Sequence, residues 1–177
     1  MMICDTAAHP RPGSVQRGFT LLELMVALLL MAAMAAWLAP GFQALGHHST
    51  LNSEATRLQA AFALARNTAI TQRTSVTVCP ANPQRNACTA GWHDTLMVVK
   101  GRATDTVEPE HVLRTFPGQS TTYTTYNRGW RRVTYTPLGH ASGYNGSFDV
   151  CATGETGKRL VLSQLGRLRI DKTPIDC

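Results

Sequence analysis

One apolar segment limits what this chain can fold into. Residues 19–39 form a run of 21 in which Glu23 is the single charged side chain. As a helix rising about 1.5 Å per residue, the run would span roughly 30 Å, which is the thickness of a bilayer core. It is too long for the apolar region of a cleaved secretory signal peptide. The sequence therefore predicts a transmembrane helix over residues 19–40.

The residues before this run predict its orientation. Residues 1–18 form a polar leader, and Arg17 stands at the membrane edge. The positive-inside rule places such a leader in the cytoplasm, so residues 41–177 are expected in the periplasm, anchored in the inner membrane. Translation from a start near Val15 would give a much shorter leader. The net charge of the whole chain, +6, favours acidic partners.

Glu23 needs a partner, because an acid at the centre of a membrane helix costs about 2.5–3.5 kcal/mol. The segment around it, RGFTLLEL at residues 17–24, resembles the cleavage and assembly signature of type IV pilins and type II secretion pseudopilins. The resemblance implies that prepilin peptidase cuts between Gly18 and Phe19, and that the new Phe19 amine is methylated. It also implies that Glu23 pairs with the terminal ammonium of a neighbouring filament subunit.

Residues 41–177 are expected to form one α+β domain. Pro40 predicts a bend, and apolar residues at helical spacing over 43–72 predict that the helix continues. These residues are Leu51, Leu58, Phe62, Ala65 and Ala69, while Glu54, Arg57, Arg66 and Arg73 are expected mostly outside that stripe. A period of two then predicts strands over 75–79, 95–99, 112–116, 123–126, 132–136, 148–152, 159–163 and 167–170. The result is a long bent helix on an antiparallel sheet or sandwich, as in type IV pilins.

Four cysteines fall in the domain that is expected in an oxidising compartment: Cys79, Cys88, Cys151 and Cys177. An even number there favours disulfides, and three pairings are possible. Proximity in the sequence favours Cys79–Cys88 and Cys151–Cys177. The spacing of Cys79, Cys88 and His93 fits no zinc finger or ribbon, so neither a metal nor a cofactor is expected. Enzyme signatures such as G-x-S-x-G or a P-loop are absent from the sequence, which indicates a protein that is not an enzyme.

The C-terminal third is basic, with eight Lys and Arg against four acids from residue 121 onward. If residues 167–170 form a strand, Arg167 and Arg169 share one face, while Leu168 and Ile170 are buried on the other. The two arginines would then stand about 6.6–6.8 Å apart, close to two axial phosphate steps along a DNA strand. Gly166 allows a tight turn before them.

A second group interleaves aromatic and basic side chains: Tyr123, Tyr126, Arg128, Trp130, Arg131, Arg132 and Tyr135. Aromatic rings can stack on the bases of a single strand, and arginines can follow its backbone. The alternative is that the aromatic rings pack in the core. Lys172 is a further basic neighbour of the pair Arg167 and Arg169.

The resemblance extends beyond the N-terminal signature. The helix segment LQAAFALARNTAI, the strand SVTVC and the ending RLVLSQLGRLRI are similar to the GspH/FimT group of minor pilins and pseudopilins. The ending contains G-R-x-R at Gly166, Arg167 and Arg169, which resembles the DNA-binding motif of FimT-type minor pilins in natural transformation.

That resemblance implies DNA, other major and minor pilins and prepilin peptidase as partners, and the pilus at the cell surface as the final location. Two alternatives stay open. One is a GspH-type pseudopilin of a type II secretion system, and the other is a structural minor pilin that primes pilus assembly.

Overall fold

The computed structural model describes residues 20–103, 106–152 and 156–177, without the side chains of 37–45 and 47. The expected leader and the cleavage site at Gly18 and Phe19 lie outside these ranges. The chain divides into two compact units, Met1–Gly41 and Phe42–Cys177. Helix α1 (Leu21–Thr71) is 51 residues long and contributes to both. The bend expected at Pro40 concerns the junction of the two units and stays a prediction.

In the first unit, the large apolar side chains of α1 between Leu21 and Met34 are exposed. Within the described ranges, no helix has both the length and the apolar character needed to cross a membrane. The transmembrane helix expected over 19–40 is therefore not confirmed.

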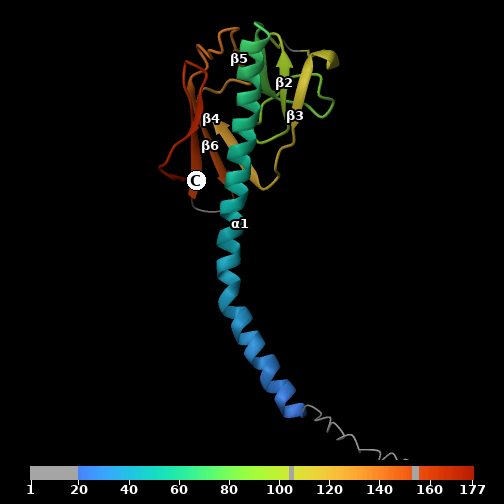
Figure 1. Ribbon diagram of the computed structural model, residues 1–177, viewed down its shortest axis with the longest axis vertical. Coiled ribbons are helices and arrows are strands. Elements are labelled where there is room, and N and C mark those ends of the chain that lie inside the picture. The colour runs from blue at the N-terminus through green and yellow to red at the C-terminus, as the bar shows by residue number, and fades with distance from the viewer. Residues whose placement is uncertain (1–19, 104–105, 153–155) are drawn as a thin grey trace, which may run out of the picture. The chain divides into compact units, whose positions relative to one another are not determined.

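The second unit holds two antiparallel sheets beside the C-terminal part of α1 (Figure 1). The first sheet has the order β3-β2-β1-β5, with β1 (Val76–Pro80), β2 (Leu96–Lys100), β3 (Val112–Phe116) and β5 (Val133–Tyr135). The C-terminal sheet has the order β4-β6-β7-β8, with β4 (Thr122–Tyr126), β6 (Gly146–Ala152), β7 (Thr156–Leu162) and β8 (Leu168–Ile170). A short strand β9 (Ile175–Asp176) pairs with β7.

All eight strands expected from the sequence are present, with bounds that differ by at most three residues. The pattern did not predict β9 or the 3-10 turn η1 (Pro109–His111), because neither is long enough to show a period. The expected α+β class is confirmed: one long helix packs on antiparallel sheets.

The core lies between the second half of α1 and the inner faces of both sheets. The apolar stripe of α1 is buried as expected, with Leu58 and Phe62 at its centre. Phe62 contacts the ring of Phe148 edge-on at a centroid distance of 5.2 Å, and Phe148 stacks on Tyr126 at 4.2 Å. These rings come from α1, β6 and β4, so they join the helix to the C-terminal sheet.

Glu54 and Arg57 correct the helix prediction. They were expected mostly outside the apolar stripe, but their exposed fractions are 0% and 8%. Glu54 lies three residues after Leu51 and four before Leu58, which places it on the buried face of the helix. The charges are tolerated there because Arg57 donates two hydrogen bonds to the Glu54 carboxylate, at 2.8 and 2.5 Å.

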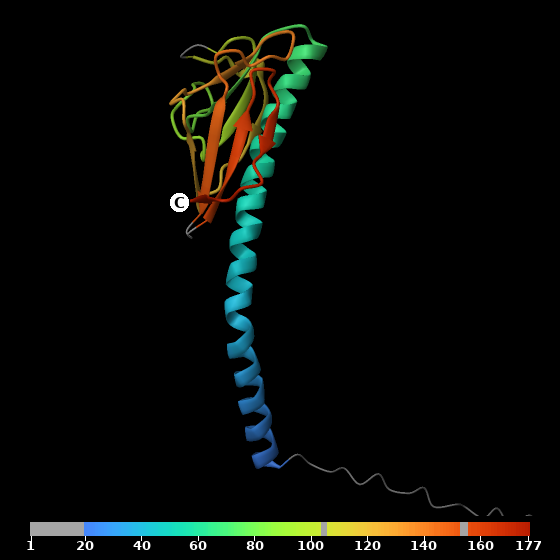
Figure 2. The ribbon, with the colours of Figure 1, turned by 90° about the vertical axis from the view of Figure 1, so that its left-hand side faces the viewer.

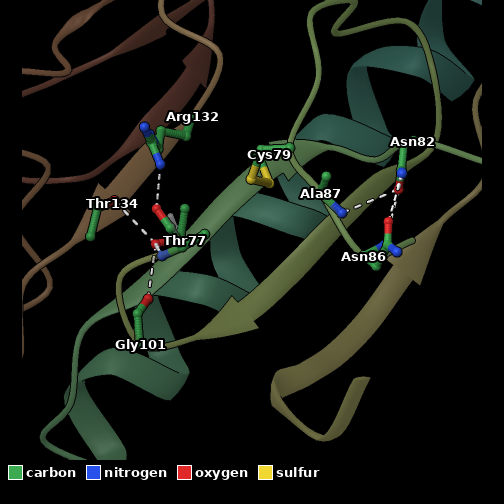
Figure 3. The surroundings of a disulfide bond; sticks show 10 residues. Thr77, Cys79, Asn82, Asn86, Ala87, Gly101, Arg132 and Thr134 are labelled. Atoms are coloured by element: carbon green, nitrogen blue, oxygen red, sulfur yellow. Dashed lines mark hydrogen bonds between the residues drawn. A yellow bond between two sulfur atoms is a disulfide. The ribbon is translucent and has the colours of Figure 1, made fainter. Parts of the chain in front are cut away.

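Two disulfides join the cysteines in the pairs that proximity favoured, Cys79–Cys88 and Cys151–Cys177. The first closes a loop after β1 (Figure 3). The side-chain oxygen of Asn82 accepts hydrogen bonds from the backbone N–H groups of Asn86 and Ala87 there, at 2.9 and 3.2 Å. The second ties the C-terminal residue to β6. Over the described part of the chain, no cluster of His, Cys, Asp and Glu is placed to hold a metal ion.

Candidate nucleic-acid interface

Arg167, directly before strand β8, and Arg169, within it, lie on the outer face of the C-terminal sheet. The register of β8 with β7 places Arg169 opposite Val161, and the pairing continues where the N–H of Ser163 donates to the Arg167 carbonyl at 3.0 Å. Both arginines are exposed, and β8 is the edge of the sheet. The strands of this sheet, orange to red, lie toward the viewer in Figure 2.

The other face of β8 differs from the expectation that both apolar residues are buried. Leu168 is half-buried and packs against the core, but Ile170 is 38% exposed. Among the strands that the structure describes, none pairs with the outer edge of β8. Ile170 therefore lines an open cleft with Leu51 of α1. Leu168 alone anchors this face of the strand.

Gly166 fixes where β8 begins. Its φ of +77° lies in the left-handed region, which non-glycine residues rarely adopt. A Cβ atom at this position would lie 2.2 Å from the carbonyl oxygen of Gly139 and 2.6 Å from the ring of Tyr135. The Tyr135 hydroxyl also donates to the Gly166 carbonyl at 3.1 Å. The turn before the two arginines is thus held against β5 and the loop after it.

A third arginine on the outer face is already neutralised. Arg159 stands opposite Asp149 and donates to both of its carboxylate oxygens, at 2.7 and 2.8 Å. These hydrogen bonds to the Asp149 carboxylate raise the pKa of the Arg159 guanidinium. By contrast, the side chains of Arg167 and Arg169 have no hydrogen bond or ion pair to any described residue. They are the cations of this face that are open to an anionic ligand.

Two lysines near β8, the predicted neighbour Lys172 and also Lys158, lie apart from this pair. Lys172 lines the cleft beside Leu51 and Ile170, on the side of the sheet that α1 covers. The ammonium group of Lys158 donates to the side chain of Asn52 on α1. The structure therefore does not bring Lys172 to the face of Arg167 and Arg169.

The interleaved aromatic and basic group divides into buried and exposed members. Tyr126 and Tyr135 are core residues, as the alternative held. Burial raises the pKa of both phenols, that of Tyr126 to about 12. Tyr123 and Trp130 are 46% and 51% exposed. Tyr123 lies on the outer face of β4, and Trp130 lies in the segment before β5.

Arg128 reaches the same end of the C-terminal sheet as the pair on β8. The backbone N–H of Asn127 donates to the carbonyl of Ser147. Across the sheet, Ser147 pairs with Val161, and Val161 pairs with Arg169. At about 4.8 Å between strands, Asn127 and Arg169 are roughly 14 Å apart across the sheet. Exposed Arg128 follows directly, so this end of the sheet has cations at both edges.

Arg131 and Arg132 line a cavity of about 750 Å³ together with Trp130 and Arg102. Arg132 is half-buried and donates to the carbonyl of Ala103 (Figure 3). Arg102 was not predicted from the sequence. It lies about 30 residues from Arg131 in the sequence, and the two approach each other only through the order β2-β1-β5. The sequence contains no local signal for that approach.

The comparisons with known proteins agree with this architecture. Residues 54–166 match the family described as "Type II transport protein GspH", which is more than half of the chain. The chain belongs to the GspH family. Residues 13–39 also match the prokaryotic N-terminal methylation motif. No curated protein sequence matches the chain.

Two crystal structures of the type IV minor pilin FimU from Pseudomonas aeruginosa strain PAO1 share the fold. One is 23% identical with a TM-score of 0.59, over 70% of this chain and 90% of FimU. The other crystal form is 24% identical with a TM-score of 0.57, over 68% and 92%. The type IV pilin-like fold is thus confirmed, and the chain is a minor pilin or GspH-like pseudopilin.

This GspH-family membership implies association with other pilins and, with the methylation motif, processing by prepilin peptidase. The family is one of structural pilins. Its matched range ends at Gly166, so Arg167 and Arg169 lie directly beyond it. The family match therefore carries no information on these two arginines.

Proposed function

We propose that this GspH-family pilin is a FimT-like minor subunit of a type IV pilus and binds DNA for uptake in natural transformation. The observation that carries the proposal is the pair Arg167 and Arg169. Both are exposed, on one face of an edge strand, and without a carboxylate partner among the described residues. Their spacing of about 6.6–6.8 Å suits two phosphates of one strand, and a guanidinium presents a planar fork to phosphate oxygens.

Binding of this kind is independent of sequence, because contacts to phosphates position DNA without reading its bases. Arg128, and more distantly Arg131, extend the positive surface at the same end of the domain. The number of neutralised phosphates stays small, so we expect modest affinity with a strong dependence on salt. The protein catalyses nothing in this function, and retraction of the filament draws captured DNA toward the envelope.

The N-terminal unit serves assembly in this proposal. Prepilin peptidase removes residues 1–18 by cutting between Gly18 and Phe19, and Phe19 is then methylated. The subunit waits in the inner membrane with its C-terminal unit in the periplasm before it enters the pilus. Glu23 then pairs with the terminal ammonium of a neighbouring pilin. Its support is that the Glu23 carboxylate on α1 is exposed and unpartnered among described residues.

One observation favours a second function, that of a pseudopilin in a type II secretion system. The matched family takes its description from type II transport, and the matched range ends before Arg167 and Arg169. In that case the charged side chains of the C-terminal sheet only keep its surface hydrated and soluble. A structural minor pilin that primes assembly would use them in the same way.

The test measures binding of the full-length chain to duplex DNA of unrelated sequences, at several salt concentrations in non-ionic detergent. We expect Arg167→Ala/Arg169→Ala to flatten the log–log salt slope by about 1.8, from about 0.9 per phosphate contact. Arg114→Ala, an exposed arginine on β3, serves as the control for a lost charge. Equal slopes for all three proteins would refute the proposed interface.

A deletion separates the remaining functions in cells. Loss of transformation with pili intact supports the DNA receptor, whereas loss of pili indicates a structural minor pilin. Loss of protein secretion alone indicates the pseudopilin.

A further inference from the structure

A cavity beside β5 is lined by arginine and aromatic side chains, and the phosphate contacts proposed for Arg167 and Arg169 do not involve it. We propose that this arginine cavity, defined by Arg102, Trp130, Arg131, Arg132, Ser142 and Tyr144, binds one unpaired nucleotide of a DNA strand. The inference rests on the proposed DNA binding, and adds to it the form of DNA that the protein prefers.

The arginine cavity has the size and charge for such a ligand. Its volume of about 750 Å³ lies within the range of small-molecule sites. Its walls come from the segment after β2, from the residues leading into β5 and from the loop before β6. Three arginines line it, and none of its described lining residues is acidic. The local field therefore favours an anion.

The three guanidiniums differ in how they are held. Arg132 is half-buried and bound to the Ala103 carbonyl, beside the hydrogen-bonded hydroxyls of Thr77 and Thr134 (Figure 3). It therefore forms part of the fixed wall. Arg102 and Arg131 are exposed, and their side chains have no hydrogen bond or ion pair to the described residues. These two are free to take the phosphate oxygens of a nucleotide.

Trp130 supplies a surface for the base. Its ring is half-exposed and meets Tyr144 edge-on, at 6.2 Å between centroids and 70° between planes. Its carbonyl accepts a hydrogen bond from the indole N–H of buried Trp92 at 3.0 Å. In the preceding turn, the Gly129 N–H donates a hydrogen bond to the Tyr126 carbonyl at 2.9 Å. The backbone that presents the ring is thus ordered before any ligand arrives.

A base inside a duplex cannot use this surface, because both of its faces are already stacked and extruding it costs energy. An unpaired base stacks on an aromatic ring at no such cost, and the hydroxyl of Ser142 is available to its polar edge. The arginine cavity should therefore distinguish single strands and frayed ends from the duplex that the β8 pair holds.

The test compares a fluorescently labelled oligo(dT) with a labelled blunt duplex, using the full-length chain in non-ionic detergent with its disulfides formed. We expect Trp130→Ala to weaken oligo(dT) binding by about 5- to 150-fold, the range for loss of one stacked base. Duplex binding should change little. Trp130→Phe keeps a ring and should retain most of the oligo(dT) affinity, which controls for folding. Arg131→Gln should weaken oligo(dT) binding more than the matched Arg114→Gln does.

The outcomes separate the two proposals. If Trp130→Ala alters oligo(dT) and duplex binding equally, or alters neither, the cavity proposal is overturned, and the proposed function still stands if Arg167→Ala/Arg169→Ala abolishes duplex binding. If the native chain binds neither DNA, both proposals fall. Competition by free thymidine monophosphate at the same nucleotide concentration would overturn the assignment to a DNA strand, since the cavity would then hold free nucleotides.

Discussion

Arg57 is the side chain whose loss we expect to cost the fold most. Besides the two hydrogen bonds to Glu54, its guanidinium donates to the carbonyls of Trp92, Asp94 and Phe116, at 2.8, 2.9 and 3.3 Å. One buried cation therefore ties α1 to the segment before β2 and to the end of β3. Arg57→Met keeps much of the aliphatic stem and removes all five hydrogen bonds.

The expected magnitude follows from what this change leaves behind. The Glu54 carboxylate is fully buried, and its other partner is the Thr124 hydroxyl at 3.3 Å. Removing one member of a buried ion pair costs about 3–5 kcal/mol, a large part of the 5–15 kcal/mol of a typical domain. In Glu54→Met/Arg57→Met no charge stays buried. The remaining cost comes from three carbonyls that lose a donor, and we expect about 0–2 kcal/mol because two of them are only partly buried.

The assay is urea unfolding of the full-length chain in non-ionic detergent, followed by tryptophan fluorescence. Arg66→Met is the matched control, because Arg66 lies on the same helix and donates one hydrogen bond, at 3.2 Å to Gly139. It should cost about 1 kcal/mol. The reasoning is refuted if Arg57→Met costs no more than Arg66→Met, or if the double variant is less stable than Arg57→Met alone.

Three further outcomes are expected. Asp149→Asn releases Arg159 on the outer face, so in the salt titration the duplex slope should steepen by up to about 0.9, while stability in urea should change little because the pair is partly exposed. Replacing Cys151 and Cys177 by Ser opens a loop with a sequence separation of 26, which should cost about 3–4 kcal/mol in the same unfolding experiment. Burial raises the pKa of Tyr126 from 10.0 to about 12, so its contribution to stability is complete below pH 10.0 and lost as pH rises to about 12. Tyr126→Phe should reduce that loss when unfolding is measured across this pH range.

The sequence predicted the elements of this fold well, because short runs that favour strands are separated by turn residues. Strands such as β4 also show the period of two, whereas β2 is a continuous buried apolar run. The sequence also predicted the disulfide pairs, since the closest cysteines in the sequence are those that meet. Burial was harder to predict. Ile170 alternates like a core residue, yet its strand is the sheet edge and the described residues leave 38% of it exposed. Glu54 lies on the buried stripe, where hydrogen bonds from Arg57 and Thr124 compensate for the burial of its charge.

The candidate site shows the same limit. The pair Arg167 and Arg169 follows from local alternation, so the sequence alone predicted that they share a face. Lys172 is close to them in sequence, but the chain leaves the strand after Ile170 and carries it to the cleft beside α1. Arg102 is distant in sequence and joins Arg131 only through the pairing of three strands. Proximity along the chain thus predicts which residues are neighbours within one strand. It does not predict which residues the strand order brings together from different strands.

The role of Gly166 explains why four residues can act as a motif in this fold. When the pairing register of a strand slips by one residue, every side chain of that strand moves to the opposite face of the sheet. Strand β8 has only three residues that hold its register. The Tyr135 hydroxyl fixes the Gly166 carbonyl, and the Gly139 carbonyl approaches so closely that a Cβ atom cannot fit. Both contacts come from β5 and the loop after it, so the face that Arg167 presents is set by packing between the two sheets. The glycine therefore contributes to the proposed DNA contact without touching DNA.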